Sequence, residues 1–371
     1  MEIREISSQE HQSFLIYRRD LDPSFLQSPS WGEVKKGAWS YRSLGFFEGN
    51  QLIGTALVLA RKAPRIPRYF FYIPEGPTLA TEHYESALEL LVKYGKEHGA
   101  FALRIGPMIV KARWEADLIK SALADESISS LNQITPSYVN PDAHSLEHTL
   151  RRIGFTQSND DPDGFAAGQP RFLYQLPIKE KSRADLLSGF NQLWRRNIKK
   201  SESEGVQVRI GTREDLGEFH RVYVETAARD HFTPRPLSYF HRMWDAFNQD
   251  SAQPDLVLFL AKWQNTVVAA SIFVELGGHS WYLYGASSTH GREVRPSNAL
   301  QWAMMERALN SQSDVYDLRG ITATLDKENP HAGLLQFKVG VGGRAVEVMG
   351  EWDYSFNPLL YLAFRAYLNR R

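Results

Sequence analysis

"EGNQLIGTALVLA", residues 48–60, and "KWQNTVVAASIFVE", residues 262–275, open the two copies of an internal repeat. In each, a polar turn leads into an apolar run of the kind typical of strands. The same three segments then follow in the same order: a short aromatic strand, a helix and a buried strand. In the first copy these segments are FFYIPEGP (70–77), YESALELLVKYGKEHGA (84–100) and FALRIG (101–106). In the second copy they are SWYLYGASS (280–288), SNALQWAMMERALNSQSD (297–314) and VYDLRG (315–320).

The repeat predicts two tandem α/β domains of the same fold, each built on a mixed sheet. Asn50 and Asn265 mark equivalent turns. We place the first domain at residues 1–165, completed by 350–371, and the second at 166–349. The turn-rich segment NDDPDGFAAG (159–168) separates them. The second domain is expected to begin with a strand, RFLYQLPI, and one helix, ADLLSGFNQLWRRNIKKSESEG. A last helix should return to the first domain.

Composition excludes several classes of protein. The chain has 371 residues, 43 basic and 43 acidic, so no strong overall attraction to nucleic acid is expected. It has no cysteine, which excludes disulfides and thiolate catalysis. No stretch approaches the roughly 20 apolar residues of a membrane span, and the polar start lacks a signal-peptide core. We therefore expect a cytoplasmic protein.

Common catalytic signatures are absent from the sequence, including G-x-S-x-G, H-E-x-x-H, the phosphate-binding P-loop and the Rossmann glycine pattern. His144 and His148 are four residues apart, but no third ligand accompanies them. A surface pair is favoured over a metal site. We expect neither a metal nor a cofactor.

Cations stand out in four places. LLQFKVGVGG (334–343) resembles a strand with a single lysine, Lys338, which is either a strand-edge side chain or a charge that faces a substrate. In FLQSPSWGEVK (25–35), Trp31 and Lys35 share one helix face. Prolines bracket Arg235 in RDHFTPRPLSYF (229–240) and would hold that cation in place.

The fourth place is a basic stretch in LWRRNIKK (193–200). On a helix its charges form two adjacent columns, which suit either RNA phosphates or a solvated face. The residues are Arg195, Arg196, Lys199 and Lys200.

Six segments, in order, resemble the FemABX family of aminoacyl-tRNA-dependent peptidoglycan-bridge transferases. They are FLQSPSWGEVK, LWRRNIKKSESEGV, RDHFTPRPLSYF, YLYGASS, YDLRGI and LLQFKVGVGG, and the resemblance covers nearly the whole chain. It implies two GNAT-like (acetyltransferase-like) domains. It also implies transfer of glycine, alanine or serine from aminoacyl-tRNA to the stem-peptide amine of a peptidoglycan precursor, either lipid II or UDP-MurNAc-pentapeptide.

The resemblance assigns roles to individual residues. Lys35 and Arg235 would bind the diphosphate of the precursor, with Lys36 able to substitute and Trp31 and Tyr239 beside them. Tyr284, Phe337 and Lys338 would lie at the acceptor and the reacting ester, and Lys338 would balance charge on the carbonyl oxygen. Glycines 340, 342 and 343 would let the tRNA end approach closely.

Two features depart from the family pattern. Gly106 replaces the aspartate that many members carry in R-I-D-P, so no carboxylate acts there. No long helical arm interrupts the second half, which leaves open how tRNA is held. We expect a monomer, and a peripheral contact with the inner membrane surface is compatible with a lipid-linked acceptor. The alternatives are an acyl-CoA-dependent N-acyltransferase, although the expected pyrophosphate loop is missing, and a non-catalytic binding protein on the same fold.

Overall fold

Each copy of the predicted repeat opens with an antiparallel hairpin in the computed structural model, which describes residues 1–158, 168–249, 254–329 and 331–368. Strand β2 (Ser40–Glu48) turns through Gly49 and Asn50 into β3 (Gln51–Lys62). Strand β12 (Asp255–Trp263) turns through Gln264 and Asn265 into β13 (Thr266–Leu276). Both residues of the second turn have positive φ, as tight two-residue hairpins require. The equivalence of Asn50 and Asn265 is confirmed.

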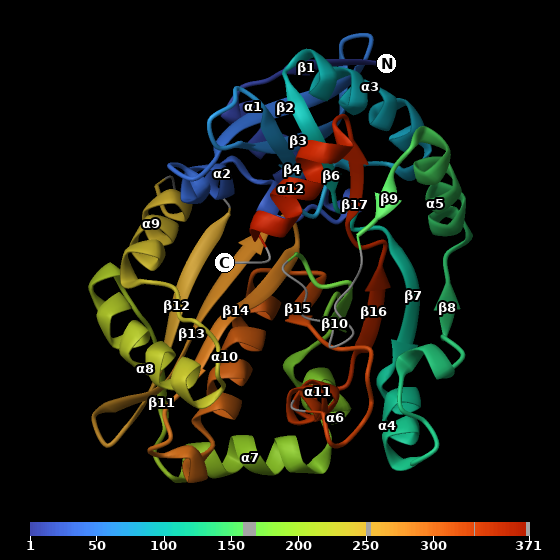
Figure 1. Ribbon diagram of the computed structural model, residues 1–371. Helices are drawn as coiled ribbons and strands as arrows, with labels where there is room; N and C mark the ends of the chain where they lie inside the picture. Colours follow the sequence, from blue (N-terminus) through green and yellow to red (C-terminus); the bar gives the residue numbers. More distant parts are fainter. Residues whose placement is uncertain (159–167, 250–253, 330, 369–371) are drawn as a thin grey trace. The chain divides into compact units, whose positions relative to one another are not determined.

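The contacts divide the chain into two compact units (Figure 1). Unit 1 comprises Met1–Arg113, Pro136–Phe172 and Val346–Arg371, and unit 2 comprises Trp114–Thr135 and Leu173–Ala345. Residues 114–135 thus group with unit 2, although the predicted boundary places them in the first domain. Most of the predicted separating segment, residues 159–167, lies outside the described residues. The functional domain boundaries stay a prediction.

The sheet of unit 1 has the strand order β1-β2-β3-β4-β6-β17-β9, with β5 paired to β3. Strands β4 and β6 run parallel and the other neighbours are antiparallel. The elements of this unit, besides the hairpin, are β1 (Glu2–Glu5), α1 (Ser8–Tyr17), α2 (Pro29–Lys35), β4 (Tyr69–Ile73), β5 (Thr78–Leu79), α3 (Tyr84–Glu97), β6 (Ala100–Ile105), most of β7 (Val110–Glu115), β8 (Tyr138–Val139), α5 (Pro141–Ile153), β9 (Thr156–Gln157), β17 (Trp352–Ser355) and α12 (Pro358–Leu368).

The sheet of unit 2 contains the order β11-β12-β13-β14-β15-β10, in which β14 and β15 are the parallel pair. This order matches β1-β2-β3-β4-β6-β17 strand for strand, so the two units share one topology. The remaining elements are α4 (Ala116–Ala124), β10 (Phe172–Pro177), α6 (Arg183–Gly189), α7 (Gln192–Ser203), β11 (Gln207–Ile210), α8 (Leu216–Arg229), α9 (Leu237–Phe247), β14 (His279–Ser287), α10 (Pro296–Asn310), β15 (Val315–Gly320), α11 (Ala332–Val339) and β16 (Arg344–Val348).

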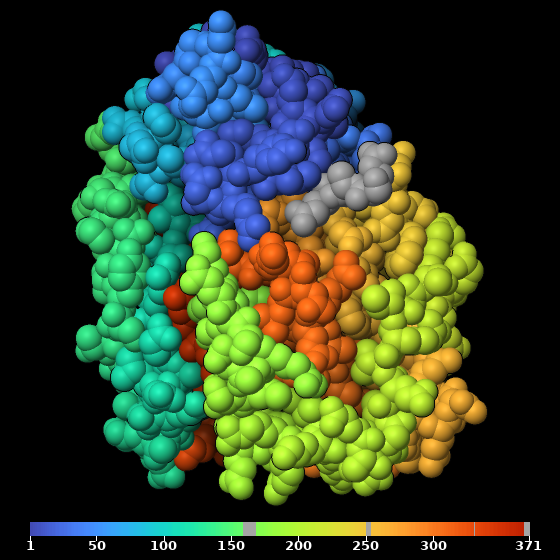
Figure 2. Space-filling model, turned by 180° about the vertical axis from the view of Figure 1, so that it is seen from behind, coloured from blue at the N-terminus to red at the C-terminus, as the bar shows by residue number. Residues whose placement is uncertain are grey.

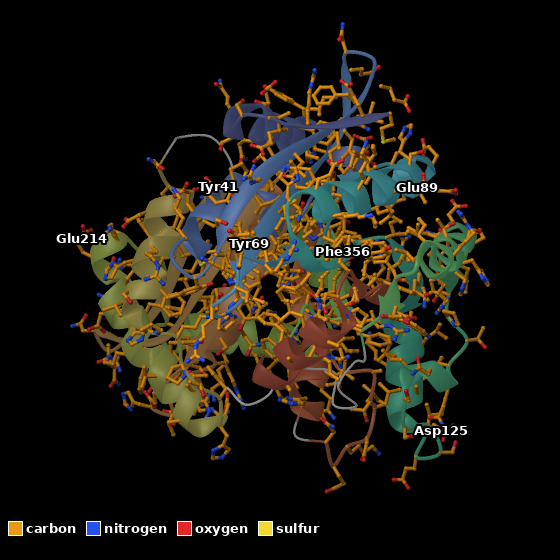
Figure 3. All side chains as sticks on the ribbon, turned by 45° about the horizontal axis from the view of Figure 1, so that its top comes forward. Tyr41, Tyr69, Glu89, Asp125, Glu214 and Phe356 are labelled. Carbon is orange, nitrogen blue, oxygen red and sulfur yellow. The ribbon has the colours of Figure 1, made fainter. Side chains whose placement is uncertain are left out.

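The core of unit 1 follows the alternation of strand residues between the two faces of the sheet. Phe71 of β4 belongs to the cluster under α3 and α5, whereas its neighbour Phe70 packs with Phe101 and with Phe364 of α12. The last helix therefore covers the opposite face of this sheet, which confirms its predicted return to the first domain. Figure 3 labels Tyr69 and Phe356, two partly buried rings that pack against the larger cluster.

The segment ADLLSGFNQLWRRNIKKSESEG, predicted as one helix, forms the two helices α6 and α7. The segment expected to form one helix breaks at Phe190, which is extended, and Asn191 then caps α7 by accepting a hydrogen bond from the Trp194 backbone N–H at 2.8 Å. Gly189 and an asparagine N-cap are ordinary stop and start signals, so the break was readable from the sequence.

The expected strand at 334–343 is wrong. Residues 332–339 form helix α11, whose buried side chains Leu335, Lys338 and Val339 follow the helical spacing of three and four. An uninterrupted apolar run does not reveal its period, because short buried strands and helices look alike. Lys338 is therefore a buried lysine in the last turn of a helix, which removes the strand-edge interpretation.

Candidate functional site

Helix α2 in unit 1 carries the first pair of predicted site residues. Ser28 caps the helix and Pro29 begins it, which favours the helical backbone from its first residue. Trp31 is buried, and the Lys35 ammonium lies 4.6 Å from its ring centroid, as the spacing of four residues predicts. Lys36 is exposed and pairs with Glu33 at 2.7 Å. Lys35 is thus held by an aromatic ring and Lys36 by a carboxylate.

Three other predicted residues meet in unit 2. The Arg235 guanidinium lies 4.7 Å from the Tyr239 ring centroid, and the Tyr239 hydroxyl is 2.9 Å from that of Tyr284. Phe240 packs edge-on against Tyr284 at 5.2 Å. Tyr284 has a left-handed backbone with φ of 48°, which is unusual for a bulky residue. The three residues form one aromatic cage around a cation.

Electrostatics within this cage favour the charged arginine. Burial works against the charge on Arg235, but the neighbouring Tyr284, Tyr239 and Tyr223 raise its pKa above the ordinary value. Burial, and then Tyr284, raise the pKa of Tyr239 well above the usual tyrosine value. At neutral pH the cage therefore holds a charged guanidinium beside the neutral hydroxyl of Tyr239, a suitable partner for an anion.

Lys338 lies in a separate cradle in the same unit. Its side chain is 3% exposed, and its Nζ donates to the carbonyl oxygens of Gly320 at 2.6 Å and Arg319 at 3.3 Å. Burial lowers the pKa of Lys338 to about 7, although Asp317 raises it and Arg319 lowers it further. A lysine of this kind changes its charge near neutral pH, which is a property of functional lysines.

The two carbonyls that hold Lys338 belong to β15, and Tyr284 of the cage belongs to β14. These neighbouring strands part from one another. The parallel pairing of β14 and β15 ends at Trp281 and Asp317. Tyr284 and Gly320 each follow three residues later, so they stand at the same level on the two sides of the opening. Gly320 is buried there and Tyr284 is partly buried, and the place where parallel strands part is a common position for binding residues in α/β sheets.

Phe337 and the following glycines pack inward. The Phe337 ring lies 4.7 Å from that of Trp194, whose Nε1 donates to the Phe337 carbonyl at 2.9 Å. A Cβ at Gly340 would approach Trp194 to 2.3 Å, and one at Gly343 would approach the Gln175 carbonyl to 2.4 Å. The expectation that these glycines leave space for tRNA is therefore wrong, because their space is filled by the protein itself.

The basic stretch lies on α7 as predicted, with all four cations exposed: Arg195, Arg196, Lys199 and Lys200. Trp194 and Ile198 face inward, so the charges lie on the outer side. The yellow-green surface of α6 and α7 borders the orange surface of α10 in Figure 2.

Sequence reasoning missed the buried polar residues around these sites. Asp317, His279 and Gln175 lie together beneath the Lys338 cradle. In unit 1, Glu75 is buried, has φ of 49° and lines a cavity of about 410 Å³. Its position after β4 and before a glycine matches that of Tyr284 after a bend in β14. The left-handed backbone of Glu75 and Tyr284 could not be predicted, because neither glutamate nor tyrosine is a residue type that favours it.

Gly106 follows β6 beside Glu75: a Cβ there would lie 3.3 Å from the Glu75 backbone nitrogen. His144 and His148 are exposed on α5, and among the described residues no group of three potential ligands could hold a metal ion. Within the same residues, no helix is both long and apolar enough to cross a membrane.

Comparison with known proteins places these sites in context. The FemAB family profile matches residues 6–262 and 258–369. The lipid II:glycine glycyltransferases of Staphylococcus saprophyticus and Staphylococcus aureus (strain MRSA252) are each 26% identical to this chain and cover 97% of it, with 94% of their own length aligned. The first alignment spans 434 positions against the 371 residues here, so the relatives carry segments without a counterpart.

Solved structures agree with the fold. The crystal structure of FemX has a TM-score of 0.80 at 24% identity and covers 98% of this chain and 99% of its own. A tandem GNAT protein from the clavulanic acid biosynthesis pathway has a TM-score of 0.51 at 10% identity, covering 95% of this chain and 98% of its own. The predicted fold of two tandem GNAT-like domains is confirmed.

Proposed function

Because the chain belongs to the FemAB family, we propose that it is an aminoacyltransferase that moves an amino acid from aminoacyl-tRNA to the stem-peptide amine of a peptidoglycan precursor. The relatives are named as glycyltransferases acting on lipid II, which supports the reaction class and a lipid-linked acceptor. The transferred residue would be glycine, alanine or serine, and the product the interpeptide bridge of the cell wall.

The buried cation Lys338 is the observation that carries this proposal. An aminoacyl ester is already activated, so aminolysis needs alignment, a stabilised oxyanion and a path for one proton. Alignment can lower the barrier by about 7–11 kcal/mol, and one preorganised donor adds on the order of 3 kcal/mol. Lys338, held by two carbonyls and shielded from water, would supply that donor without further reorganisation.

The Arg235 cage would bind the diphosphate of the precursor. A guanidinium offers two parallel donors to a phosphate, and the stacked Tyr239 fixes its plane before the ligand arrives. Tyr284 adds a hydroxyl beside it. Lys35, with Lys36 and Trp31, would contribute a second charge to the same ligand from α2. The convergence of Lys35 and Arg235 on one diphosphate is part of the proposal.

Transfer from an acyl-CoA is the alternative for a GNAT-like fold. That reaction places pyrophosphate on the free N–H groups at a helix start. Helix α10, at the corresponding place in unit 2, begins with Pro296, which has no N–H to donate to a pyrophosphate. This observation favours the tRNA donor over acyl-CoA.

We further propose that α12 contacts an anionic lipid surface, where a lipid-linked acceptor would be found. Phe364 anchors the helix to the sheet, while Leu359 and Leu362 are 83% and 66% exposed. Ala363 and Ala366 continue that outer face at helical spacing. After Asp353 the sequence has only cationic charges, Arg365, Arg370 and Arg371. Two leucines offer far less than the roughly 800 Å² per partner of a stable dimer, so a membrane suits this face better.

Two donors decide between the proposed reactions. Purified protein is given either charged tRNA or acetyl-CoA, together with a muramyl pentapeptide precursor, and the acceptor is analysed for the added group. The proposal expects an aminoacyl group and no acetyl group. A binding protein on the same fold would transfer neither.

A further inference from the structure

Asp317 is a fully buried carboxylate at the base of the Lys338 cradle. Its Oδ1 accepts from the Arg319 backbone N–H at 2.6 Å, and its Oδ2 accepts from Gln175 Nε2 at 3.1 Å. His279 Nε2 lies 3.5 Å from the same Oδ2. A buried carboxylate destabilises a fold unless such partners offset the loss of water, so one retained here invites a functional explanation.

The contact with Arg319 shapes the cradle. In a regular strand successive carbonyls point to opposite sides, so two neighbouring carbonyls cannot both face one ammonium. Arg319 escapes this rule through its left-handed backbone, with φ of 64°. The Asp317 side chain bonds the N–H two residues on, which is the local arrangement that stabilises such a bend. Both carbonyls can then turn to Lys338.

We infer that Asp317 is a positioning residue for Lys338. It fixes the bend at Arg319 that aims two carbonyls at the ammonium, and it supplies the negative charge that keeps the buried ammonium protonated. This inference rests on the proposed function only for its effect on turnover, because the protonation of Lys338 is measurable without substrate.

The charges acting on Lys338 are few. Asp317 favours its protonation and Arg319 opposes it. Burial raises the pKa of Asp317, but His279, Arg319 and Gln175 together lower it below the usual value, so it is a carboxylate at neutral pH. Helices α4 and α7 flank α11, and the charged side chains that they carry near it pair with each other or are exposed: Asp117, Lys120, Arg195 and Arg196.

Two substitutions separate charge from geometry. Asp317→Asn keeps the shape and the acceptor for Arg319 but removes the charge, so we expect the pKa of Lys338 to fall by about one unit. Asp317→Glu keeps the charge but moves the carboxylate by one methylene. We expect it to leave the pH dependence of kcat in place and to lower kcat about tenfold to a hundredfold, with KM for the precursor unchanged.

The pKa of Lys338 is read from its own NMR signal, using protein labelled at lysine Nζ and the Lys338→Met variant to identify that signal. Asp353→Asn is the matched control, because Asp353 is also a buried, hydrogen-bonded carboxylate and belongs to unit 1. An unmoved Lys338 titration in Asp317→Asn would overturn the inference, even in an active enzyme. If Asp317→Asn does not fold, an unchanged kcat in Asp317→Glu would overturn it. If the wild-type protein transfers no amino acid, but the pKa of Lys338 falls as expected in Asp317→Asn, only the proposed function is refuted.

Discussion

Lys338 is 3% exposed, so in its protonated form its field acts on a group brought against it with little screening by water. Among the described residues its hydrogen-bond acceptors are two carbonyl oxygens, which leaves one of its three donors for a ligand. Sequence could single out this lysine, because a lone cation in an apolar run is conspicuous. The sequence could not predict the carbonyl groups that hold it, since they depend on the left-handed backbone of Arg319, nineteen residues earlier in the chain.

Replacing Lys338 by methionine tests its role at the residue scale. The substitution keeps the length and removes the charge. We expect kcat to fall by roughly two to three orders of magnitude, as when one oxyanion donor is lost, with KM for the precursor nearly unchanged. Steady-state kinetics with charged tRNA measure both constants. A raised KM with normal kcat would instead make Lys338 a binding residue.

The pH dependence of wild-type kcat follows from the same residue. Lys338 stabilises negative charge only when protonated, so activity should decline as the pH rises through about 7, the pKa to which burial lowers it. The Lys338→Met variant should lack this decline. A residual activity that still falls across this range in the variant would assign the titration to another group.

At the scale of elements, α7 and α12 are helices with exposed outer faces: α7 presents four cations, of which Arg195 also donates to the Ser188 carbonyl at 3.3 Å, and α12 presents two leucines. The helical position and exposure of the α7 cations were predictable, because their spacing of four needs only a helix. Helix α11 was not, because its run of apolar residues fits either period. The break between α6 and α7 shows the opposite case, since its Gly-Phe-Asn signal was present and was not used.

The α7 cations should contact tRNA phosphates. Reversing all four charges to glutamate should weaken tRNA binding, and the slope of log affinity against log salt should drop by roughly 0.7–0.9 for each contact removed. Filter binding across a salt series measures it. Lys179 and Lys181, exposed lysines elsewhere in unit 2, provide the control reversal. Unchanged affinity in the quadruple variant would return α7 to an ordinary solvated face.

The outer face of α12 should bind vesicles. Leu359→Ser with Leu362→Ser should reduce co-sedimentation with vesicles containing phosphatidylglycerol, and should lower transfer to a lipid-linked acceptor while sparing a soluble one. Ile210→Ser, which alters another exposed apolar side chain, on β11 of unit 2, is the control. The assignment would be contradicted if the wild-type protein did not co-sediment with anionic vesicles, or if it formed a dimer through this face.

The whole molecule is a duplication, and its evidence was largely in the sequence. The order of hairpin, strand, helix and strand was legible twice, because Asn-containing turns and apolar periods are local signals. The places of strands β17 and β10 in the two sheets could not be predicted from the sequence. Strand β17 occupies in unit 1 the place that β10 occupies in unit 2, although one follows its unit's central strands and the other precedes them. Such long-range pairing leaves no local mark in the sequence.

One measurement tests the central claim most directly. Purified protein is incubated with tRNA charged with a complete set of labelled amino acids and with either lipid II or UDP-MurNAc-pentapeptide, and the acceptor is analysed by mass spectrometry. The account predicts that the stem-peptide amine gains an aminoacyl residue, that acetyl-CoA gives no acetyl product, and that Lys338→Met reduces the yield at least about a hundredfold. An acetylated acceptor, or no aminoacyl product from either precursor, would contradict it.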